Sequence, residues 1–206
     1  MNELFTIGHS THTVERVIDL LSSHHIGALA DVRSSPYSRF TPQFNREPLQ
    51  RACAAGGISY VYLGQELGAR SADPACVIDG RVSFSRLAQT ALFRNGIDRL
   101  IKGMERFRVS LLCAEKDPVA CHRMILVCRQ MKTHAPAIVH ILENGAVEDN
   151  AAAERRLMQM LNINENDLFL SEGELINKAY DLQGEKIAYT QDQERDHDAF
   201  HDRLYP

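Results

Sequence analysis

The sequence predicts an α/β protein with an open, mostly parallel sheet of about five strands flanked by helices, and with a C-terminal helical appendage. Along the first 144 residues, short β-rich apolar runs alternate with helical patterns, which is typical of βα units. After Asn144 and Gly145 the sequence becomes helix-prone. The chain has 206 residues, 44% of them hydrophobic, so it is long enough to bury a core without disulfides.

Each expected element rests on its own run of residues and the turn signals around it. The apolar runs expected as strands are 4–7, 28–32, 58–63, 109–113 and 138–142. The helices expected between them are 14–21, 47–55, 84–107 and 119–131. Gly27, Gly57 and Pro136 each stand just before a strand run, where turn residues belong.

The chain is expected to have three parts. Residues 1–144 form the α/β domain that carries the candidate site, and residues 145–190 form a helical extension of the same domain. This extension packs either on the sheet or on a partner chain, so a homo-oligomer formed through it is one expectation. Residues 191–206 form a polar, acidic tail that is expected to be loosely held.

Charge and composition exclude several classes of protein. Residues 181–206 hold seven of the 27 acidic residues and three of the 23 basic ones, which leaves the rest of the chain neutral. This balance disfavours coating by nucleic acid, but a local basic groove, and with it nucleic acid as a partner, stays open. Because no signal segment and no apolar stretch of about 20 residues is present, we expect a cytoplasmic protein without a membrane partner. The five cysteines lack zinc-ribbon spacing and are expected as reduced thiols.

Polar residues follow the predicted strands, at the point where each strand ends. They are His9 and Ser10 after the first strand, Asp31 and Arg33 after the second, Glu66 and Arg70 after the third, and Cys113 and Glu115 after the fourth. In open parallel sheets, ligands bind outside the carboxyl ends of the strands. The four segments are therefore expected to converge on one site.

The stretch LLCAEKDPVACHR, residues 111–123, joins a predicted strand to a predicted helix. Asp117 and Pro118 suit the N-cap and first position of that helix, which puts Cys121 and His122 near its first turn. The positive end of a helix dipole favours a thiolate or a bound anion there. Alternatively, Cys121 is a core thiol, because it lies on an apolar helical face. That face also carries Met124, Ile125, Cys128 and Met131.

The sequence leaves open which way the side chain of Arg123 points and what role Glu115 has. A helix that begins at Pro118 turns Arg123 to solvent, whereas a start at Cys121 or His122 turns it inward. Glu115 lies in the preceding loop and is either a general acid/base or a carboxylate that holds an arginine.

Three thiol chemistries can be compared for the same stretch. The spacing from Cys113 to Arg123 is too long for a phosphatase-type thiolate loop, and no glycine lies between them. A zinc site made of Cys113, Cys121, His122 and His9 has acceptable ligand types, but its spacing matches no common ribbon, so no cofactor is predicted. A redox or sulfur-transfer pair of Cys113 and Cys121 requires both thiols to face the crevice.

A second group of functional residues lies in DVRSSPYSRFTPQFNREPLQR. Between Arg33 and Arg51 it has four arginines against one glutamate, with Tyr37 and Phe44 among its aromatic residues. Arginine forks bind carboxylate or phosphate bidentately, and aromatic faces stack on planar rings. This loop, including Arg39, is therefore expected to bind a small anionic ligand or a nucleotide. The alternative is a packed loop with solvated arginines.

The order of TIGHS, DVRSSPYSRFTPQFN, YLGQELGAR and CAEKDPVACHR resembles the domain of unknown function 488 family over about residues 4–144. The resemblance implies a compact α/β domain but no established reaction. The characteristic residues that it implies are His9, Asp31, Arg33, Pro36, Phe44, Leu63, Gly64, Cys113, Glu115, Cys121, His122 and Arg123. Neither a dinucleotide-binding glycine fingerprint nor a P-loop is present.

The leading hypothesis is an enzyme of hydrolase or transferase type with an arginine-rich, aromatic-edged pocket for a phosphorylated, nucleotide-like or nucleic-acid-derived substrate. The candidate catalytic residues are Glu115, Asp31, His9, Cys113, Cys121 and His122. The candidate substrate-binding residues are Arg33, Tyr37, Arg39, Phe44, Glu66, Arg70, Arg123 and Ser10. The alternatives are a non-catalytic module that binds nucleotide or nucleic acid, and thiol-based chemistry through Cys113 and Cys121.

Overall fold

A computed structural model describes residues 2–165 and 167–190, and the predicted acidic tail at 191–206 lies outside this range. At its centre is a six-stranded sheet with the order β3-β2-β6-β1-β7-β8. The strands are β1 (Leu4–Gly8), β2 (Ala28–Asp31), β3 (Ser59–Tyr62), β6 (Val109–Cys113), β7 (Ile138–Ile141) and β8 (Val147–Asp149). All neighbours pair in parallel except β7 and β8. The predicted α/β class is confirmed, with six strands instead of about five.

The sixth strand, β8, is a short edge strand that the apolar pattern does not reveal. It follows β7 through a tight turn in which Gly145 has a φ of 90° and the side chain of Asn144 accepts a hydrogen bond from the N–H of Ala146. Val147 in this strand is 52% exposed, so the strand carries no buried run. The sheet therefore continues into the segment expected as the helical extension.

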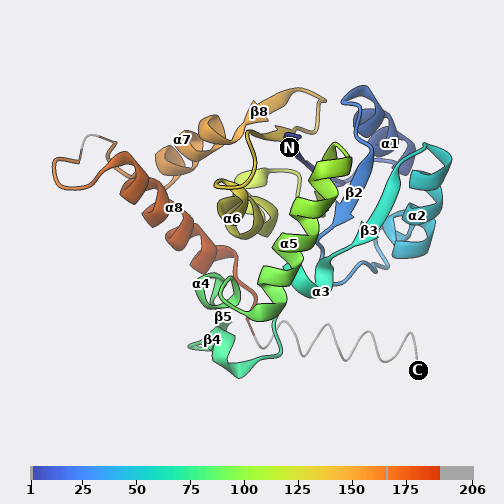
Figure 1. Cartoon of the computed structure of the whole chain (residues 1–206). Helices are drawn as coiled ribbons and strands as arrows, with labels where there is room; N and C mark the ends of the chain where they lie inside the picture. Colours follow the sequence, from blue (N-terminus) through green and yellow to red (C-terminus); the bar gives the residue numbers. More distant parts are fainter. Residues whose placement is uncertain (1, 166, 191–206) are drawn as a thin grey trace.

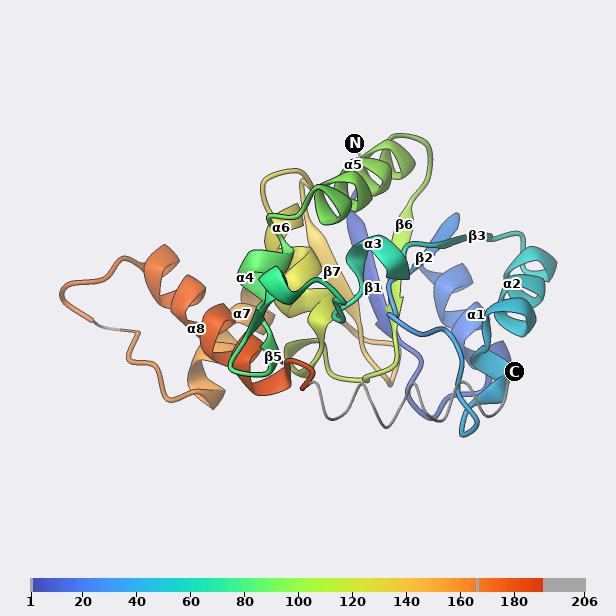
Figure 2. The ribbon, with the colours of Figure 1, turned by 90° about the horizontal axis from the view of Figure 1, so that it is seen from below.

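Helices cover both faces of the sheet, and side chains alternate between two cores. Phe5 and Ile7 point to the face covered by α1 (Val14–Ser23) and α2 (Arg46–Ala55). Leu4 points to the opposite face, which is covered by α5 (Ala91–Arg106). Figure 2 shows α5 on one side of the sheet and α1 and α2 on the other. The inner strands are buried on both faces, which explains their uninterrupted apolar sequence.

The single helix expected at 84–107 is two helices, α4 (Phe84–Leu87) and α5. The chain breaks between them because the hydroxyl of Thr90 accepts a hydrogen bond from the N–H of Phe93 and caps a new helix. Several short elements were not predicted. They are α3 (Gly64–Leu67), the hairpin of β4 (Val77–Ile78) and β5 (Arg81–Val82), and the 3-10 turns η1 (Pro42–Phe44) and η2 (Pro74–Cys76).

The helix expected at 119–131 is also interrupted, and this break shapes the site. A 3-10 turn, η3 (Pro118–Ala120), is capped by Asp117 and is followed by Cys121 in an extended conformation. The chain then forms a π-helical segment, η4 (Arg123–Cys128), and a last α-helical turn, α6 (Arg129–Met131). The later of the two predicted starts is therefore the one observed, and Arg123 turns inward.

The C-terminal extension packs on the sheet of its own chain. Its helices are α7 (Asn150–Met160) and α8 (Glu172–Ile187), which lie on the side of the sheet away from α2 (Figure 1). Their anchor is a buried network in which one carboxylate oxygen of Glu154 accepts hydrogen bonds from Asn150, Tyr180 and Lys132. Beyond α8, the carbonyl of Tyr189 accepts a hydrogen bond from the N–H of Val82 and ties the chain to the hairpin.

Among the described residues, no helix has the length and apolar character needed to cross a membrane.

Candidate functional site

The loops after β1 and β6 run side by side at the carboxyl edge of the sheet. The N–H of His9 donates to the carbonyl of Cys113 (2.9 Å), and the N–H of Ser10 donates to that of Ala114 (2.8 Å). A Cβ atom on Gly8 would lie 1.8 Å from the carbonyl oxygen of Glu115. Only glycine therefore allows the two loops to pack this closely.

Four functional side chains of the second loop converge on one point. The thiols of Cys113 and Cys121 both donate to Oε2 of Glu115, with sulfur-to-oxygen distances of 2.9 and 3.0 Å. Nδ1 of His122 lies 3.5 Å from the sulfur of Cys113. The polar atoms of these four residues all lie within 4.8 Å of one another. Glu115 is exposed as a residue but turns its carboxylate onto the two buried sulfurs.

Backbone contacts fix the orientation of the imidazole and one thiol. Nε2 of His122 lies 2.9 Å from the carbonyl oxygen of Val32, a contact in which this nitrogen must carry the proton. In the neutral imidazole, Nδ1 then keeps its lone pair and faces Cys113. The N–H of Arg123 donates to the sulfur of Cys121 (3.4 Å).

Arg123 supports the loop from beneath and does not reach the crevice. Its guanidinium is fully buried and donates to the carbonyl oxygens of Glu115 and Lys116, and to the hydroxyl of Thr6. Arg123 is thus bound by the backbone carbonyl of Glu115, not by the carboxylate of Glu115. Contrary to the expectation for Arg123, its donors are directed at protein oxygens, so we treat it as a positioning residue.

Arg33 is held rigidly by Asp31. Nε and one terminal nitrogen of Arg33 donate to the two carboxylate oxygens of Asp31, at 2.9 and 2.6 Å. The same terminal nitrogen donates to the carbonyl of Phe44, and the hydroxyl of Tyr60 also donates to Asp31. Burial opposes the charge of Arg33, but these hydrogen bonds outweigh it and raise its pKa. Asp31 is fully buried and its carboxylate accepts hydrogen bonds from these donors, so it orients Arg33.

His9 lies behind Arg33. Its Nδ1 contacts the carbonyl of Ser10 (3.2 Å), and its Nε2 lies 3.4 Å from Arg33. Its ring stacks on that of Phe44, with 4.3 Å between the centroids. Burial, together with the charge of Arg33, lowers the pKa of His9 to about 4, so the imidazole is neutral at pH 7. Phe44 is fully buried and packs against His9, and it is not among the residues that line the crevice described below.

A small crevice of about 220 Å³ opens above the cluster. Its charged and reactive lining residues are Arg33, Arg70, Cys113, Glu115 and His122. The guanidinium of Arg70 lies over the ring of Tyr189 at 4.3 Å, and Tyr189 also lines the crevice. Nε of Arg70 is buried and has no hydrogen-bond partner among the described residues. The crevice is therefore cationic on one side and carries the cluster on the other.

Several residues predicted for the site lie outside this crevice, within the part of the chain that the structure describes. Tyr37 donates to the carboxylate of Glu47, and the guanidinium of Arg39 lies over the ring of Phe40. Glu66 is paired with Arg99 of α5. The loop turns away because the N–H of Ser38 donates to the side chain of Asn45, which folds residues 38–45 back on themselves. Ser10 contributes backbone atoms to the joined loops.

Sequence reasoning missed Tyr189. This residue follows α8, far along the chain from every motif that marks the site. It reaches the crevice because the backbone of the hairpin β4–β5 binds residues 189 and 190. An aromatic residue just after a helix gives no signal of such a role.

The charges of the cluster are strongly coupled. Burial raises the pKa of Cys113, and its hydrogen bond with Cys121 raises it further. Burial also opposes a thiolate at Cys121, yet the contact with Cys113 and the charge of Arg123 lower its pKa well below the usual range. Burial and the sulfur of Cys121 raise the pKa of Glu115. Burial lowers the pKa of His122, but contacts with Cys121 raise it by more, so the net shift is upward. If one thiol of the pair loses its proton, these contacts favour the thiolate at Cys121 over that at Cys113.

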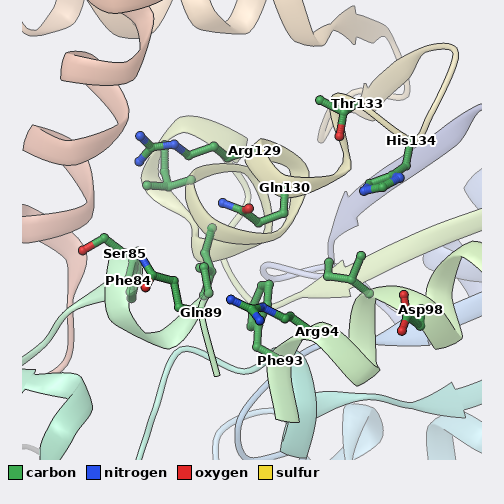
Figure 3. Close-up of a pocket in the computed structure, with 14 residues that line it drawn as sticks. Phe84, Ser85, Gln89, Phe93, Arg94, Asp98, Arg129, Gln130, Thr133 and His134 are labelled. Atoms are coloured by element: carbon green, nitrogen blue, oxygen red, sulfur yellow. The ribbon is translucent and has the colours of Figure 1, made fainter. Parts of the chain in front are cut away.

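A larger hollow of about 570 Å³ lies elsewhere, between α4, α5 and the segment 123–131 (Figure 3). Arg94, Arg129 and Gln130 are among its polar lining residues. Arg129 is already bound to Asp181 and Asn177. Among the described residues, neither a cysteine nor a glutamate lines it. Its volume is greater, and Asp98 and His134 give it a carboxylate and an imidazole, but among the described residues it lacks the thiol that lines the crevice.

The fold and the site define an α/β protein with a thiol, carboxylate and imidazole cluster at the carboxyl edge of a parallel sheet. The family model described as "Domain of unknown function DUF488" matches residues 13–129, and the chain belongs to this family. The match includes the whole cluster and Arg33 and Arg70, but not Tyr189. No curated protein and no solved structure matches the chain significantly.

Proposed function

We propose that this protein is an enzyme that binds the anionic group of a small phosphorylated or nucleotide-like substrate in the crevice and acts on it by acid/base chemistry. The observation that carries the proposal is the arrangement of the crevice. Arg33 and Arg70 line it together with Glu115, His122 and Cys113. Guanidinium groups bind phosphate or carboxylate oxygens, and carboxylates and imidazoles transfer protons.

The crevice suits a small anion or the anionic end of a larger substrate. Its volume of about 220 Å³ is below the roughly 300–1,000 Å³ typical of pockets that enclose a drug-sized ligand. Arg33 is held in place by Asp31, and Arg70 by the ring of Tyr189. Two guanidinium groups with fixed positions lose little entropy when an anion binds, which favours affinity and orientation.

Glu115 is the proposed proton-transfer group. Its carboxylate lies at the crevice, and the carbonyl oxygen of the same residue is fixed by Arg123. His9 and Asp31, by contrast, contact Arg33 and lie outside the crevice lining among the described residues. Their proposed role is to position Arg33.

Turnover by a panel of purified variants tests this assignment. The full chain is assayed for product release from phosphate monoesters, phosphate diesters and nucleotides. Glu115→Gln is expected to lose at least about 100-fold in kcat, the usual contribution of general acid/base catalysis, without loss of the fold. Glu143→Gln is the matched control, because Glu143 is an exposed carboxylate paired with Lys116 outside the crevice. Full activity in Glu115→Gln overturns the assignment.

Thiol chemistry is a second candidate, supported by the contact of both sulfurs with one oxygen of Glu115. Catalysis that needs both thiols would be lost in Cys113→Ser and in Cys121→Ser, whereas these variants retain ligand binding. A non-catalytic module that binds nucleotide or nucleic acid would instead show salt-dependent binding and no product with any substrate.

A cytoplasmic location is part of the proposal. All five cysteines are free and buried. Reduced thiols persist in reducing compartments, so this pattern favours the cytoplasm. Fractionation of cells that express the tagged chain tests it.

A further inference from the structure

The cluster of Cys113, Glu115, Cys121 and His122 has the donor atoms of a transition-metal site. Two sulfurs, one imidazole nitrogen and one carboxylate oxygen lie within 4.8 Å of one another. Tetrahedral zinc, with ligand distances of about 2.0–2.3 Å, requires separations of about 3.3–3.8 Å between its ligand atoms. Three of the contacts, at 2.9, 3.0 and 3.5 Å, lie near this range, and every other pair of ligand atoms is within 4.8 Å. Small movements of side chains would therefore complete the geometry.

The surroundings of His122 match those of a metal ligand. A ligating histidine usually donates its second ring N–H to a carboxylate, a carbonyl or water, which fixes the nitrogen that faces the metal. Nε2 of His122 contacts the carbonyl of Val32 at 2.9 Å and leaves Nδ1 pointing at Cys113. The N–H of Arg123 likewise orients the sulfur of Cys121. Both ligands are thus fixed from outside the cluster.

The local backbone brings these donors together from two segments. Cys113 ends β6, and Glu115 follows in the loop. Cys121 has an extended backbone between η3 and the π-helical segment, which lets it face the same point as His122. π-helical turns are rare and occur frequently at functional sites. The interruption of the helix therefore serves the cluster.

We propose that Cys113, Cys121 and His122 bind one zinc ion, with Glu115 as its exchangeable fourth ligand. Two sulfur donors favour zinc over magnesium or calcium. The three inner ligands are buried, whereas Glu115 is exposed and lines the crevice. A set of two cysteines and one histidine occurs in catalytic zinc sites that keep the fourth position for water or substrate. The inference rests on the proposed function, because the ion would lie in the same crevice and polarise an oxygen of the anion bound there.

Cobalt provides the test, because its absorption reports thiolate ligands. The full chain is stripped with a chelator and titrated with Co²⁺, and Zn²⁺ is then added. One equivalent of Co²⁺ is expected to give a thiolate-to-metal charge-transfer band, and Zn²⁺ is expected to displace it. Cys113→Ser and Cys121→Ser should lose the band. Cys76→Ser, which alters a buried thiol outside the cluster, should keep it.

Glu115→Ala tests the site even if a cysteine variant fails to fold. Glu115 is exposed in the loop, so its replacement should leave the fold intact. The variant is expected to keep the thiolate band and to bind the metal at least about 10-fold more weakly, because loss of a direct ligand costs no less than loss of an outer-shell partner. Absence of a stoichiometric band in the wild-type chain overturns the inference. So does a full-strength band in a folded Cys113→Ser or Cys121→Ser variant.

The two proposals fail in different ways. Turnover that persists in chelator-stripped protein supports the proposed function and overturns the role of zinc in it, while absence of a stoichiometric cobalt band overturns the zinc site itself. Stoichiometric binding of zinc through both thiols, without turnover of any substrate in the panel, supports the zinc inference and counts against the proposed function.

Discussion

Arg33 and Asp31 form a two-pronged ion pair whose side chains are 7% and 0% exposed. Removal of one partner from a buried pair leaves the other charge uncompensated and costs about 3–5 kcal/mol. Asp31→Asn is therefore expected to lower the free energy of unfolding by that amount, as measured by urea denaturation. Glu143→Gln, which breaks a solvent-exposed pair with Lys116, should cost no more than about 1 kcal/mol. Equal effects in the two variants would contradict this account of Arg33.

Gly8 is required because the loops after β1 and β6 are in close contact. An added Cβ would meet the carbonyl oxygen of Glu115 at 1.8 Å, so Gly8→Ala must push the two loops apart. We expect it to lower the free energy of unfolding by about 1–3 kcal/mol or more. At Gly103, inside α5, the nearest atom is 4.0 Å away, so Gly103→Ala should be neutral or stabilise by about 0.5–1 kcal/mol. Thermal unfolding of both variants measures the difference. No loss of stability in Gly8→Ala would show that the loops are not tightly packed.

His140 makes the fold sensitive to acid. It is fully buried between Thr6 and Asn150, and burial, with the charge of Arg123, lowers its pKa from 6.5 to about 4. Between these values the unfolded chain takes up a proton that the native chain refuses, so stability falls as pH drops from about 6.5 to about 4. The loss due to this group is on the order of 3 kcal/mol.

The acid sensitivity can be measured by urea denaturation across this range of pH. His140→Gln should remove about one of the protons taken up on unfolding, while His9, whose pKa is also lowered to about 4, still supplies another. His134→Gln, at an exposed imidazole, is the control and should leave the slope unchanged. An identical slope in the wild-type chain and in His140→Gln would refute the role of His140.

Tyr189 is expected to affect ligand binding although it comes from the C-terminal extension. Its ring supports the guanidinium of Arg70 at 4.3 Å. Tyr189→Ala should weaken the binding of an anion by about 2–30-fold, which corresponds to about 0.5–2 kcal/mol for a cation–π contact. Tyr189→Phe keeps the ring and should restore the wild-type Kd in isothermal titration. Equal affinities in the alanine and wild-type chains would exclude this support.

Much of the fold could be predicted because its strands are buried and its helices are periodic. β1 and β6 carry apolar residues at nearly every position, which only a doubly covered strand explains. β8 was missed because it is a three-residue edge strand without a buried apolar residue. The break at Cys121 could not be predicted either, because the spacing of the apolar residues that follow it fits a continuous α-helix as well as a π-helix.

The site could be predicted in part because parallel strands end at one edge. That rule predicts that Arg33, Arg70 and Glu115 lie near one another, and all three line the same crevice. The same rule also predicts Tyr37 and Glu66 at the site. In the structure Tyr37 is instead hydrogen-bonded to Glu47, and Glu66 forms an ion pair with Arg99. Side-chain partners of this kind depend on loop geometry, which residue type and order do not specify.

A thermal-shift screen shows whether the crevice lined by Arg33 and Arg70 binds the ligand. The wild-type chain, Arg70→Ala and Arg94→Ala are screened against inorganic phosphate, sugar phosphates and nucleotides. Arg94 lines the larger hollow of Figure 3 and serves as the matched control. A ligand at 100 times its Kd stabilises by about 2.7 kcal/mol, which raises Tm by several degrees. If the crevice is the ligand site, the shift persists in Arg94→Ala and is lost in Arg70→Ala. A shift lost only in Arg94→Ala, or no shift with any compound, would contradict that assignment.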